Sequence, residues 1–217
     1  LAAAVTMAFS ASAMAETLIM GIEAAYPPFN NKDASGNVVG FDKDIGDALC
    51  AKMKVECEVA VSDWDGIIPA LNAKKFDFLA ASMSITEERM KAIDFTDKYY
   101  NTPTSVITAK GSGLTPEAAS LAGKVIGTQV STIQEAYVTA HYPDSTLKSY
   151  QTSDETYQDL AAGRIDAVVA DSLVVADFLK TEAGACCENV GNVEDDPAIL
   201  GLGVGFGLRK GDPLKDK

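Results

Sequence analysis

The chain has 217 residues, of which 47% are hydrophobic and 23% charged, as is typical of a globular protein with a sizeable core. Its 31 acidic residues outnumber its 18 basic residues, which gives a net charge of −13. Nucleic acid and anionic membrane surfaces repel such a chain, so both are excluded as main partners. A single histidine and the lack of a Cys-x-x-Cys motif leave no metal pattern, and we expect neither a metal nor a cofactor.

The first 15 residues form a short apolar run that ends in Ala13, Met14 and Ala15. This Ala-x-Ala pattern is typical of the cleavage site of a secretory signal peptide, and the run is too short to span a membrane. We therefore predict that residues 1–15 are the remnant of a signal peptide. The alternative is an Ala-rich first helix, which is disfavoured because the first convincing strand follows immediately.

Strands and helices are predicted to alternate along the rest of the chain. The apolar patterns predict strands at residues 18–21, 55–61, 76–82, 124–127, 147–151 and 165–170. They predict helices at residues 41–54, 64–73, 86–92, 114–121, 132–141, 153–162 and 171–180. An extended segment at residues 95–109 interrupts the alternation, after which the same layout recurs. The expected fold is therefore α/β, with two lobes that each hold a mainly parallel sheet flanked by helices.

The glycines of residues 201–207 alternate strictly, so they do not form the G-x-G-x-x-G motif of a dinucleotide site. We expect a strand that crosses between the lobes instead. The chain also lacks a phosphate loop and a G-x-S-x-G nucleophile elbow. The pattern after Pro213 predicts a helix that has not begun at Lys217, so we expect the natural chain to continue.

Residues 82–89, Ser-Met-Ser-Ile-Thr-Glu-Glu-Arg, join a predicted strand end to a helix start. Unpaired N–H groups at a helix start attract anions, and the guanidinium of Arg89 can grip a carboxylate with two parallel hydrogen bonds. The segment therefore indicates a site for a small carboxylate. The alternative is a plain helix cap, with either Ser84 or Thr86 as the N-cap and Arg89 paired with Glu88.

Ligands of open α/β sheets bind beyond the carboxyl ends of the strands. Polar and aromatic side chains at these ends are Glu23, Tyr26, Asp42, Trp64, Ser82, Ser84, Arg89, Gln129, Thr132, Gln134 and Asp171. Arg89 would bind a carboxylate, Asp171 an ammonium group, and Glu23 a distal positive charge. The alternatives are structural: core packing for Trp64, a helix cap for Asp171, and a solvated loop position for Glu23.

The chain has four cysteines. Cys50 and Cys57 lie late in a predicted helix and in the following strand, and in an exported chain we expect this pair to be oxidised. Cys186 and Cys187 are adjacent, and three states remain open for them: a vicinal disulfide, two thiols, or pairing between molecules.

Several motifs occur in a characteristic order: Tyr26-Pro-Pro-Phe29, Gly40-Phe41-Asp42, and residues 62–69, 82–89, 134–137 and 163–166. With them the chain resembles the family 3 extracellular solute-binding proteins, and among these the periplasmic lysine/arginine/ornithine- and histidine-binding group. The resemblance covers residues 16–217. It implies a first lobe of residues 16–102 and 203–217 and a second lobe of residues 103–202, which close on one amino acid.

The resemblance also implies roles for single residues. Arg89 would hold the α-carboxylate with Ser84 and Thr132, while Asp171 and the backbone near Ser82 would bind the α-amino group. The expected site is completed by Glu23, Tyr26, Asp42, Trp64, Met83, Gln129 and Gln134. The Cys50–Cys57 pair matches a disulfide of the basic amino-acid binders.

Three positions depart from the pattern of the basic amino-acid binders: Ala81 replaces a serine, Ile133 a threonine, and Glu23 an aspartate. The acid is kept, which favours a cationic ligand. The expected function is therefore a monomeric periplasmic receptor that delivers a free L-amino acid to a membrane ABC permease. The alternatives are an enzyme resembling the cyclohexadienyl dehydratases and an input domain of a sensor.

Overall fold

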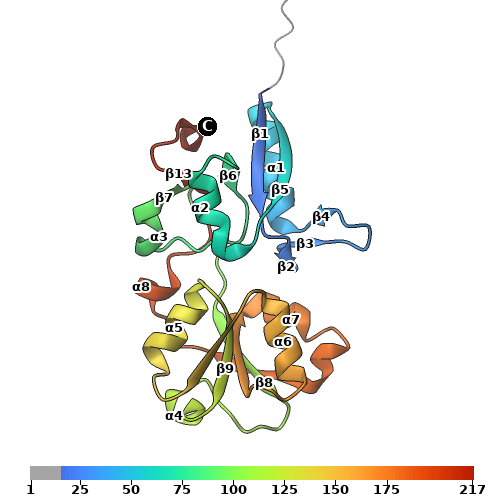
Figure 1. The fold of residues 1–217 in the computed structure, drawn as a ribbon, viewed down its shortest axis with the longest axis vertical. Coiled ribbons are helices and arrows are strands. Elements are labelled where there is room, and N and C mark those ends of the chain that lie inside the picture. Colours follow the sequence, from blue (N-terminus) through green and yellow to red (C-terminus); the bar gives the residue numbers. More distant parts are fainter. Residues whose placement is uncertain (1–15) are drawn as a thin grey trace, which may run out of the picture.

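The computed structural model describes residues 16–217, which form two lobes joined by crossing segments (Figure 1). The predicted signal peptide remnant, residues 1–15, lies outside the described residues. Each lobe contains one five-stranded sheet, with the orders β5-β1-β6-β13-β7 and β10-β9-β11-β8-β12. A small sheet, β2-β3-β4, is attached to the first lobe. The predicted two-lobed α/β fold is confirmed.

The strands of the first lobe are β1 (Thr17–Ile22), β2 (Ala25–Tyr26), β3 (Asn30–Lys32), β4 (Val38–Val39), β5 (Glu56–Val61), β6 (Phe78–Leu79), β7 (Ile93–Phe95) and β13 (Gly207–Arg209). Its helices are α1 (Phe41–Met53), η1 (Trp64–Gly66), α2 (Ile67–Asn72), α3 (Glu87–Ala92) and η3 (Pro213–Asp216), where η denotes a 3₁₀-helix.

The strands of the second lobe are β8 (Thr104–Ala109), β9 (Val125–Gln129), β10 (Thr146–Tyr150), β11 (Ala167–Asp171) and β12 (Cys187–Asn192). Its helices are α4 (Ala118–Leu121), α5 (Ile133–His141), α6 (Ser153–Ala161), α7 (Ser172–Phe178) and η2 (Ala183–Cys186). Helix α8 (Pro197–Leu200) precedes the return to the first lobe.

Helices cover both faces of each sheet because side chains of a strand alternate between its faces. In β11, Val168 and Ala170 pack in a cluster with α6 and α7, whereas Ala167 and Val169 pack in a cluster with α4 and α5. In β1, Leu18, Met20 and Ile22 belong to the cluster that includes Cys50 of α1. The strand ends are therefore fixed between two packed layers, which positions the loops that follow them.

Each sheet is mixed. β1 pairs with β5 and β6 in parallel, and β9 pairs with β10 and β11 in parallel. The strands that enter from the other lobe, β8 and β13, pair antiparallel to their neighbours. Each sheet therefore contains the predicted parallel strands and, in addition, one antiparallel strand that enters where the chain crosses from the other lobe.

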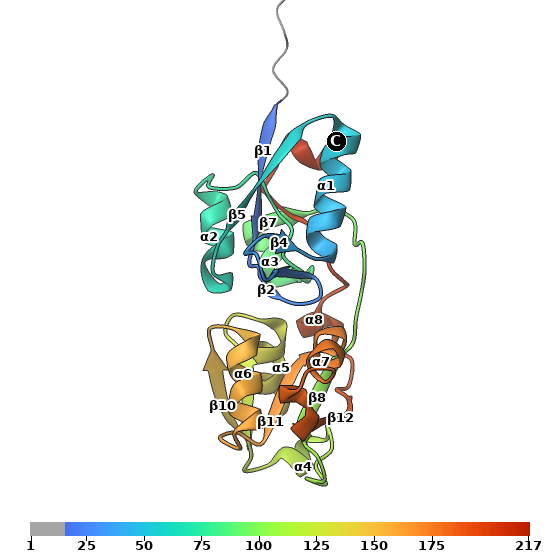
Figure 2. The ribbon, with the colours of Figure 1, turned by 90° about the vertical axis from the view of Figure 1, so that its right-hand side faces the viewer.

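The two crossing segments, residues 96–103 and 193–206, hydrogen bond to each other. Tyr99 N donates to Val204 O at 2.9 Å, Val204 N donates to Tyr100 O at 2.9 Å, and Thr96 N donates to Phe206 O at 3.0 Å. The first segment runs along one edge of the molecule (Figure 2). Paired crossing segments of this kind let two lobes move as bodies about a short hinge.

Two predicted strands are shorter in the structure. The strand predicted at residues 76–82 is confined to Phe78–Leu79, because Ser82 has a φ of 51° and turns the chain out of the sheet. Within the predicted strand at residues 201–207, only Gly207 joins a sheet, and Val204 forms isolated bridges to Ser84 and Tyr100.

The four cysteines form two disulfides. Cys50 of α1 is bonded to Cys57 of β5, as predicted, and ties helix to sheet at the outer edge of the first lobe. The structure pairs Cys186 with Cys187, which selects the vicinal disulfide among the three states that the sequence left open.

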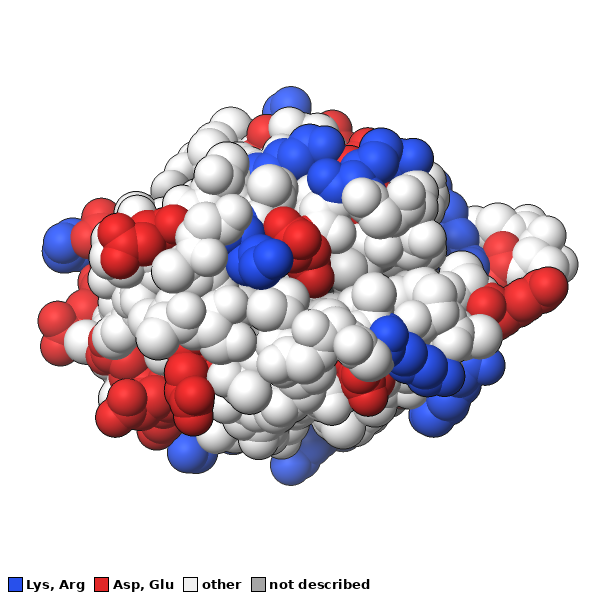
Figure 3. Space-filling model, turned by 90° about the horizontal axis from the view of Figure 1, so that it is seen from below, with Lys and Arg blue, Asp and Glu red and all other residues white. Residues whose placement is uncertain are grey.

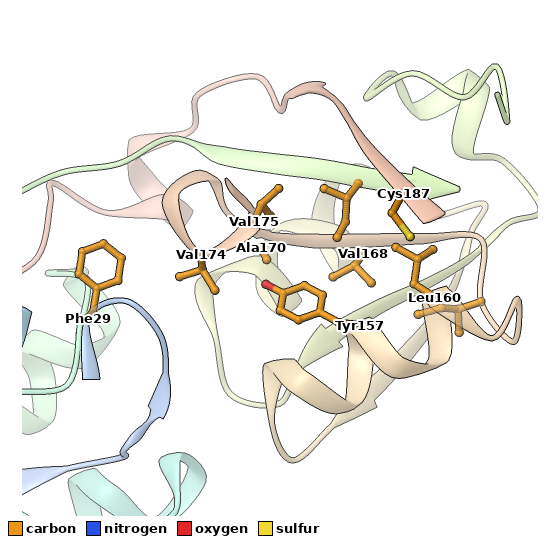
Figure 4. Close-up of a cluster of buried hydrophobic side chains, with 10 residues drawn as sticks. Phe29, Tyr157, Leu160, Val168, Ala170, Val174, Val175 and Cys187 are labelled. Carbon is orange, nitrogen blue, oxygen red and sulfur yellow. The ribbon is translucent and has the colours of Figure 1, made fainter. Parts of the chain in front are cut away.

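Phe29 packs across the lobes. It follows β2 in the first lobe, is 4% exposed, and belongs to the cluster of Val174 and Tyr157 in the second lobe (Figure 4). Its ring also stacks on Tyr100 of the first crossing segment, with ring centroids 4.7 Å apart. An apolar contact of this kind stabilises the closed arrangement of the lobes independently of any charge.

Asp42 lies inside the first lobe and not in a cleft, which corrects its prediction as a binding residue. It is 0% exposed and accepts hydrogen bonds from Asn30 Nδ2 at 2.8 Å, from Ser82 Oγ at 2.7 Å and from the hydroxyl of Tyr99. Its side chain therefore ties α1 to the chain at Ser82 and to the first crossing segment.

Replacing Asp42 by Asn is expected to destabilise the fold by about 1–3 kcal/mol, because an amide N–H₂ would face at least one of the three donors and leave it buried without an acceptor. Urea unfolding monitored by circular dichroism measures the change. Asp65→Asn is the matched control, since Asp65 is exposed. Equal stability of the two variants would contradict the structural role of Asp42.

Candidate functional site

A cleft lies between the lobes and contains about 500 Å³ that protein atoms do not fill, open solvent at its mouth included. Its walls combine charged, amide, hydroxyl and aromatic side chains from both lobes. The lining residues are Glu23, Tyr26, Trp64, Ala81, Ser82, Ser84, Arg89, Gln129, Thr132, Ile133, Gln134, Ser153, Val169, Ala170 and Asp171. All the predicted binding residues except Asp42 and Met83 therefore lie at one cleft.

The side chain of Met83, which was predicted at the binding site, also lies outside the cleft. Its side chain is 0% exposed and packs with Ile67 and Leu71 of α2. Ser82 and Ser84, on either side of it, line the cleft. The left-handed φ of Ser82 turns the chain at this point, and the two serines border the cleft while Met83 packs in the core.

Arg89 reaches across the cleft from α3. Thr86 is the N-cap of this helix, and its hydroxyl accepts from Arg89 N at 3.2 Å, so Thr86 rather than Ser84 is the cap. The guanidinium donates to Ser84 O at 3.0 Å and, across the cleft, to Ser131 O at 3.3 Å. Burial lowers its pKa to about 10, so the group stays charged at neutral pH.

Trp64 supports the same contact between the lobes. Its Nε1 donates to Ser131 O at 3.2 Å, and its ring lies 5.1 Å from the Cζ atom of Arg89, which is a cation–π distance. One carbonyl oxygen of the second lobe therefore accepts hydrogen bonds from two side chains of the first.

The opposite wall is built by the start of α5. Thr132 is its N-cap and accepts from Glu135 N at 3.2 Å, while its hydroxyl donates to Gln129 O at 2.7 Å. Thr132, and not its neighbour Ser131, is therefore the cap of α5. Thr132 thus has a structural role at the same point where it borders the cleft.

Asp171 ends β11 and caps α7. It accepts from Leu173 N at 3.0 Å and from the hydroxyl of Thr102, so the predicted cap is present in a residue that also lines the cleft. Burial raises the pKa of this carboxyl, and its hydrogen bonds oppose that shift. The cleft therefore carries a cationic group on the first lobe and an acidic group on the second.

Glu23 lies in the same cleft and is 8% exposed. Its Oε1 accepts from Gln129 Nε2 at 2.5 Å, which is a further contact between the lobes. Burial raises the pKa of Glu23 to about 7, with smaller contributions from the charges of Asp63 and Asp154 and an opposing effect of the Gln129 hydrogen bond. It is thus a buried acid and not the solvated loop residue of the alternative interpretation.

Sequence reasoning missed Ser153 as a site residue. It is the first residue of α6, and its hydroxyl donates to Gln129 Oε1 at 3.2 Å. The signal was present, because Thr152 and Glu155 form a capping box directly after a predicted strand.

In the view from below, acidic side chains gather at the left, and basic side chains form a band near the upper edge (Figure 3). In residues 16–217, no group of three or more His, Cys, Asp or Glu side chains is arranged to hold a metal ion. Within the same residues, no helix has the length and apolar character needed to cross a membrane.

Residues 18–177 match the sequence model of a protein family, the bacterial extracellular solute-binding proteins, family 3. The L-arginine-binding protein of Pseudomonas aeruginosa is 45% identical over 196 residues, which cover 89% of this chain and 76% of that protein. The lysine/arginine/ornithine-binding periplasmic protein of Escherichia coli is 41% identical over 210 residues, which cover 95% of this chain and 81% of that protein.

Solved structures show the same fold. An ancestral arginine-binding protein bound to glutamine superposes with a TM-score of 0.85 at 36% identity, covering 94% of this chain and 88% of that one. An ancestral amino acid-binding protein, a precursor of cyclohexadienyl dehydratase, superposes with a TM-score of 0.80 at 32% identity, covering 92% and 84%. The chain described here belongs to family 3 of the bacterial extracellular solute-binding proteins.

Proposed function

We propose that this protein is the periplasmic receptor of an amino-acid ABC importer and that it binds a cationic L-amino acid of the arginine, lysine, ornithine and histidine group. The observation that carries the proposal is the charge pattern of one cleft, with Arg89 on the first lobe, Asp171 on the second, and a further buried acid, Glu23. An amino acid with a basic side chain carries three charges of the complementary signs.

Arg89 takes the α-carboxylate in this proposal. A fork of guanidinium N–H groups matches a carboxylate in a plane, and the hydroxyls of Ser84 and Thr132 border the same wall. Arg89 forms no ion pair with an acidic residue in the described part of the chain, so a ligand carboxylate supplies its counter-charge.

Asp171 takes the α-amino group. It is already oriented by its cap to α7 and by Thr102, so little side-chain entropy is lost when the ammonium binds. Tyr26 and Trp64 enclose the side chain of the ligand, and Glu23 with Gln129 and Gln134 receives its distal end.

Closure of the lobes completes the site. Arg89 and Trp64 contact Ser131, and Glu23 contacts Gln129, so the same residues that would hold the ligand already bridge the lobes. A ligand that contacts both walls shifts the open–closed equilibrium by the difference between its affinities for the two states. The closed form is then the one that a membrane permease engages. We further propose that the receptor acts as a monomer and reaches the periplasm through a cleaved signal peptide.

An enzyme related to cyclohexadienyl dehydratase is the second candidate. The observation in its favour is Glu23, whose pKa of about 7 suits a general acid at neutral pH. The pairing of Arg89 with Asp171 favours an amino acid that is bound and released unchanged. Incubation with prephenate and arogenate separates the candidates, because product formation above the buffer background would favour the enzyme.

Arg89→Ala is expected to weaken L-arginine binding by about 30-fold or more, because truncating one partner of a desolvated charge pair costs about 2–5 kcal/mol. Arg89→Lys keeps the charge without the planar fork and should fall between wild type and Arg89→Ala. Isothermal titration calorimetry measures all three proteins.

Arg164→Ala is the matched control for the Arg89 variants, since Arg164 is exposed and pairs with Asp159 outside the cleft. Its affinity should equal that of wild type. An Arg89→Ala protein that binds within threefold of wild type would rule out the assigned carboxylate contact.

A thermal-shift panel of free L-amino acids tests the ligand class. A ligand at 100 times its Kd stabilises the native state by about 2.7 kcal/mol, which raises the Tm of a domain of this size by roughly 5–10 °C. At pH 8, where Glu23 is mostly ionised, we expect such shifts only with arginine, lysine, ornithine or histidine. Shifts with aspartate, glutamate or leucine alone would refute the assigned role of Glu23.

A further inference from the structure

The amide of Gln129 has a fixed orientation. Its Nε2 donates both to Glu23 Oε1 at 2.5 Å and to Gln151 O at 3.0 Å, and its Oε1 accepts from Ser153 Oγ at 3.2 Å. Both N–H groups are therefore used, and the side chain is 6% exposed. The carbonyl oxygen of Gln151 can only accept, so the amide nitrogen must face it, and the same nitrogen then faces Glu23 in either protonation state of Glu23.

This orientation decides what Glu23 presents to a ligand. Gln129 satisfies Oε1 as an N–H donor, whether Glu23 is ionised or protonated. The structure gives Oε2 no protein partner within residues 16–217. Ionised Glu23 therefore offers the cleft an anionic acceptor at Oε2, and protonated Glu23 offers it an O–H donor.

The surroundings of Glu23 leave it without a protein counter-charge. Burial raises its pKa, and the charged groups that add to this shift are acids, Asp63 before η1 and Asp154 on α6. Tyr26 stands beside it, and Arg89 and Asp171 line the same cleft. No basic side chain of the described residues pairs with Glu23, so its compensating charge is either a proton or the ligand.

We propose that a proton on Glu23 selects between two ligand classes: ionised Glu23 holds a cationic side chain, and protonated Glu23 holds a neutral side chain of equal length that ends in a hydrogen-bond acceptor. A ureido or carboxamide group is such an end. A cationic ligand that binds the protonated form displaces its proton to solvent, and a neutral ligand leaves the proton in place. This inference rests on the proposed function and specifies the selectivity of the same cleft.

The sign of the pH dependence follows from linkage. Burial raises the pKa of Glu23 to about 7, and a bound cation lowers it. Affinity for a cationic ligand is therefore fully present above pH 7 and falls about tenfold for each pH unit below it. Between pH 8 and pH 5.5 the affinity should drop about 30-fold, whereas affinity for the neutral ligand should hold or rise.

L-arginine and L-citrulline provide a matched pair, since they have nearly the same shape and differ in charge at the distal group. Calorimetric titrations at pH 8 and pH 5.5 give the ratio of their two Kd values, in which effects on the shared α-carboxylate and α-amino group cancel. We expect the preference for arginine to fall about 30-fold or more at the lower pH. Titrations at pH 6 in buffers of different ionisation enthalpy should show release of close to one proton per arginine and none per citrulline.

Two variants isolate Glu23. In Glu23→Gln the ratio of the two Kd values should not change with pH, and circular dichroism checks that this variant is folded. Asp154→Asn keeps Glu23 but removes a neighbouring negative charge, so the change in preference should move to lower pH. A wild-type ratio that is constant from pH 8 to pH 5.5 would overturn the inference and leave the proposed function intact. Absence of binding by either ligand at any pH would overturn both.

Discussion

Two charged side chains in one cleft, Arg89 and Glu23, lack a counter-charge among the described residues. Arg89 donates only to carbonyl oxygens of Ser84 and Ser131, and Glu23 accepts from the neutral amide of Gln129. A partly desolvated ion without an opposite charge is costly, and burial accordingly shifts the pKa of both groups toward the neutral form, to about 10 for Arg89 and about 7 for Glu23. A ligand with a carboxylate at one end and a cation at the other removes the cost at both positions.

The scaffold fixes the positions of Arg89 and Glu23 and joins the two lobes around them. The two sheets fix the strand ends, Asp42 ties α1 to Ser82 and to the first crossing segment, and Thr86 fixes the start of α3. Phe29 and the hydrogen-bonded crossing segments join the lobes without using the cleft charges. Closure is thus supported by apolar packing at the hinge and regulated by charge in the cleft.

Much of this arrangement follows from the sequence. The positions of Arg89, Asp171 and Glu23 after predicted strands were sufficient to group them, because the carboxyl ends of parallel strands meet at one edge. The side chains of Asp42 and Met83, which were also predicted at the site, do not line the cleft, and the reason is common to both. The left-handed φ of Ser82 and the long-range bonds of Asp42 decide which way the side chains point, and neither has a local sequence pattern.

The orientation of the Gln129 side chain is likewise set by contacts between residues far apart in the sequence. Its amide is set by Glu23, 106 residues away along the chain, and by Ser153 on α6. The apolar alternation of a strand and the capping motif of a helix depend only on residues that are close in sequence. They therefore predicted where Gln129 lies but not the direction of its amide nitrogen. The proposed selectivity therefore rests on contacts that only the folded chain reveals.

We infer that the half-buried guanidinium of Arg89, which has no counter-charge among the described residues, binds the α-carboxylate of an amino acid. Calorimetric titration of the wild-type protein with L-arginine and with L-argininamide tests it most directly, because amidation removes the carboxylate charge and keeps the side chain and the α-amino group. We expect L-argininamide to bind about 30-fold more weakly than L-arginine, or worse. Equal affinity of the two compounds would contradict it.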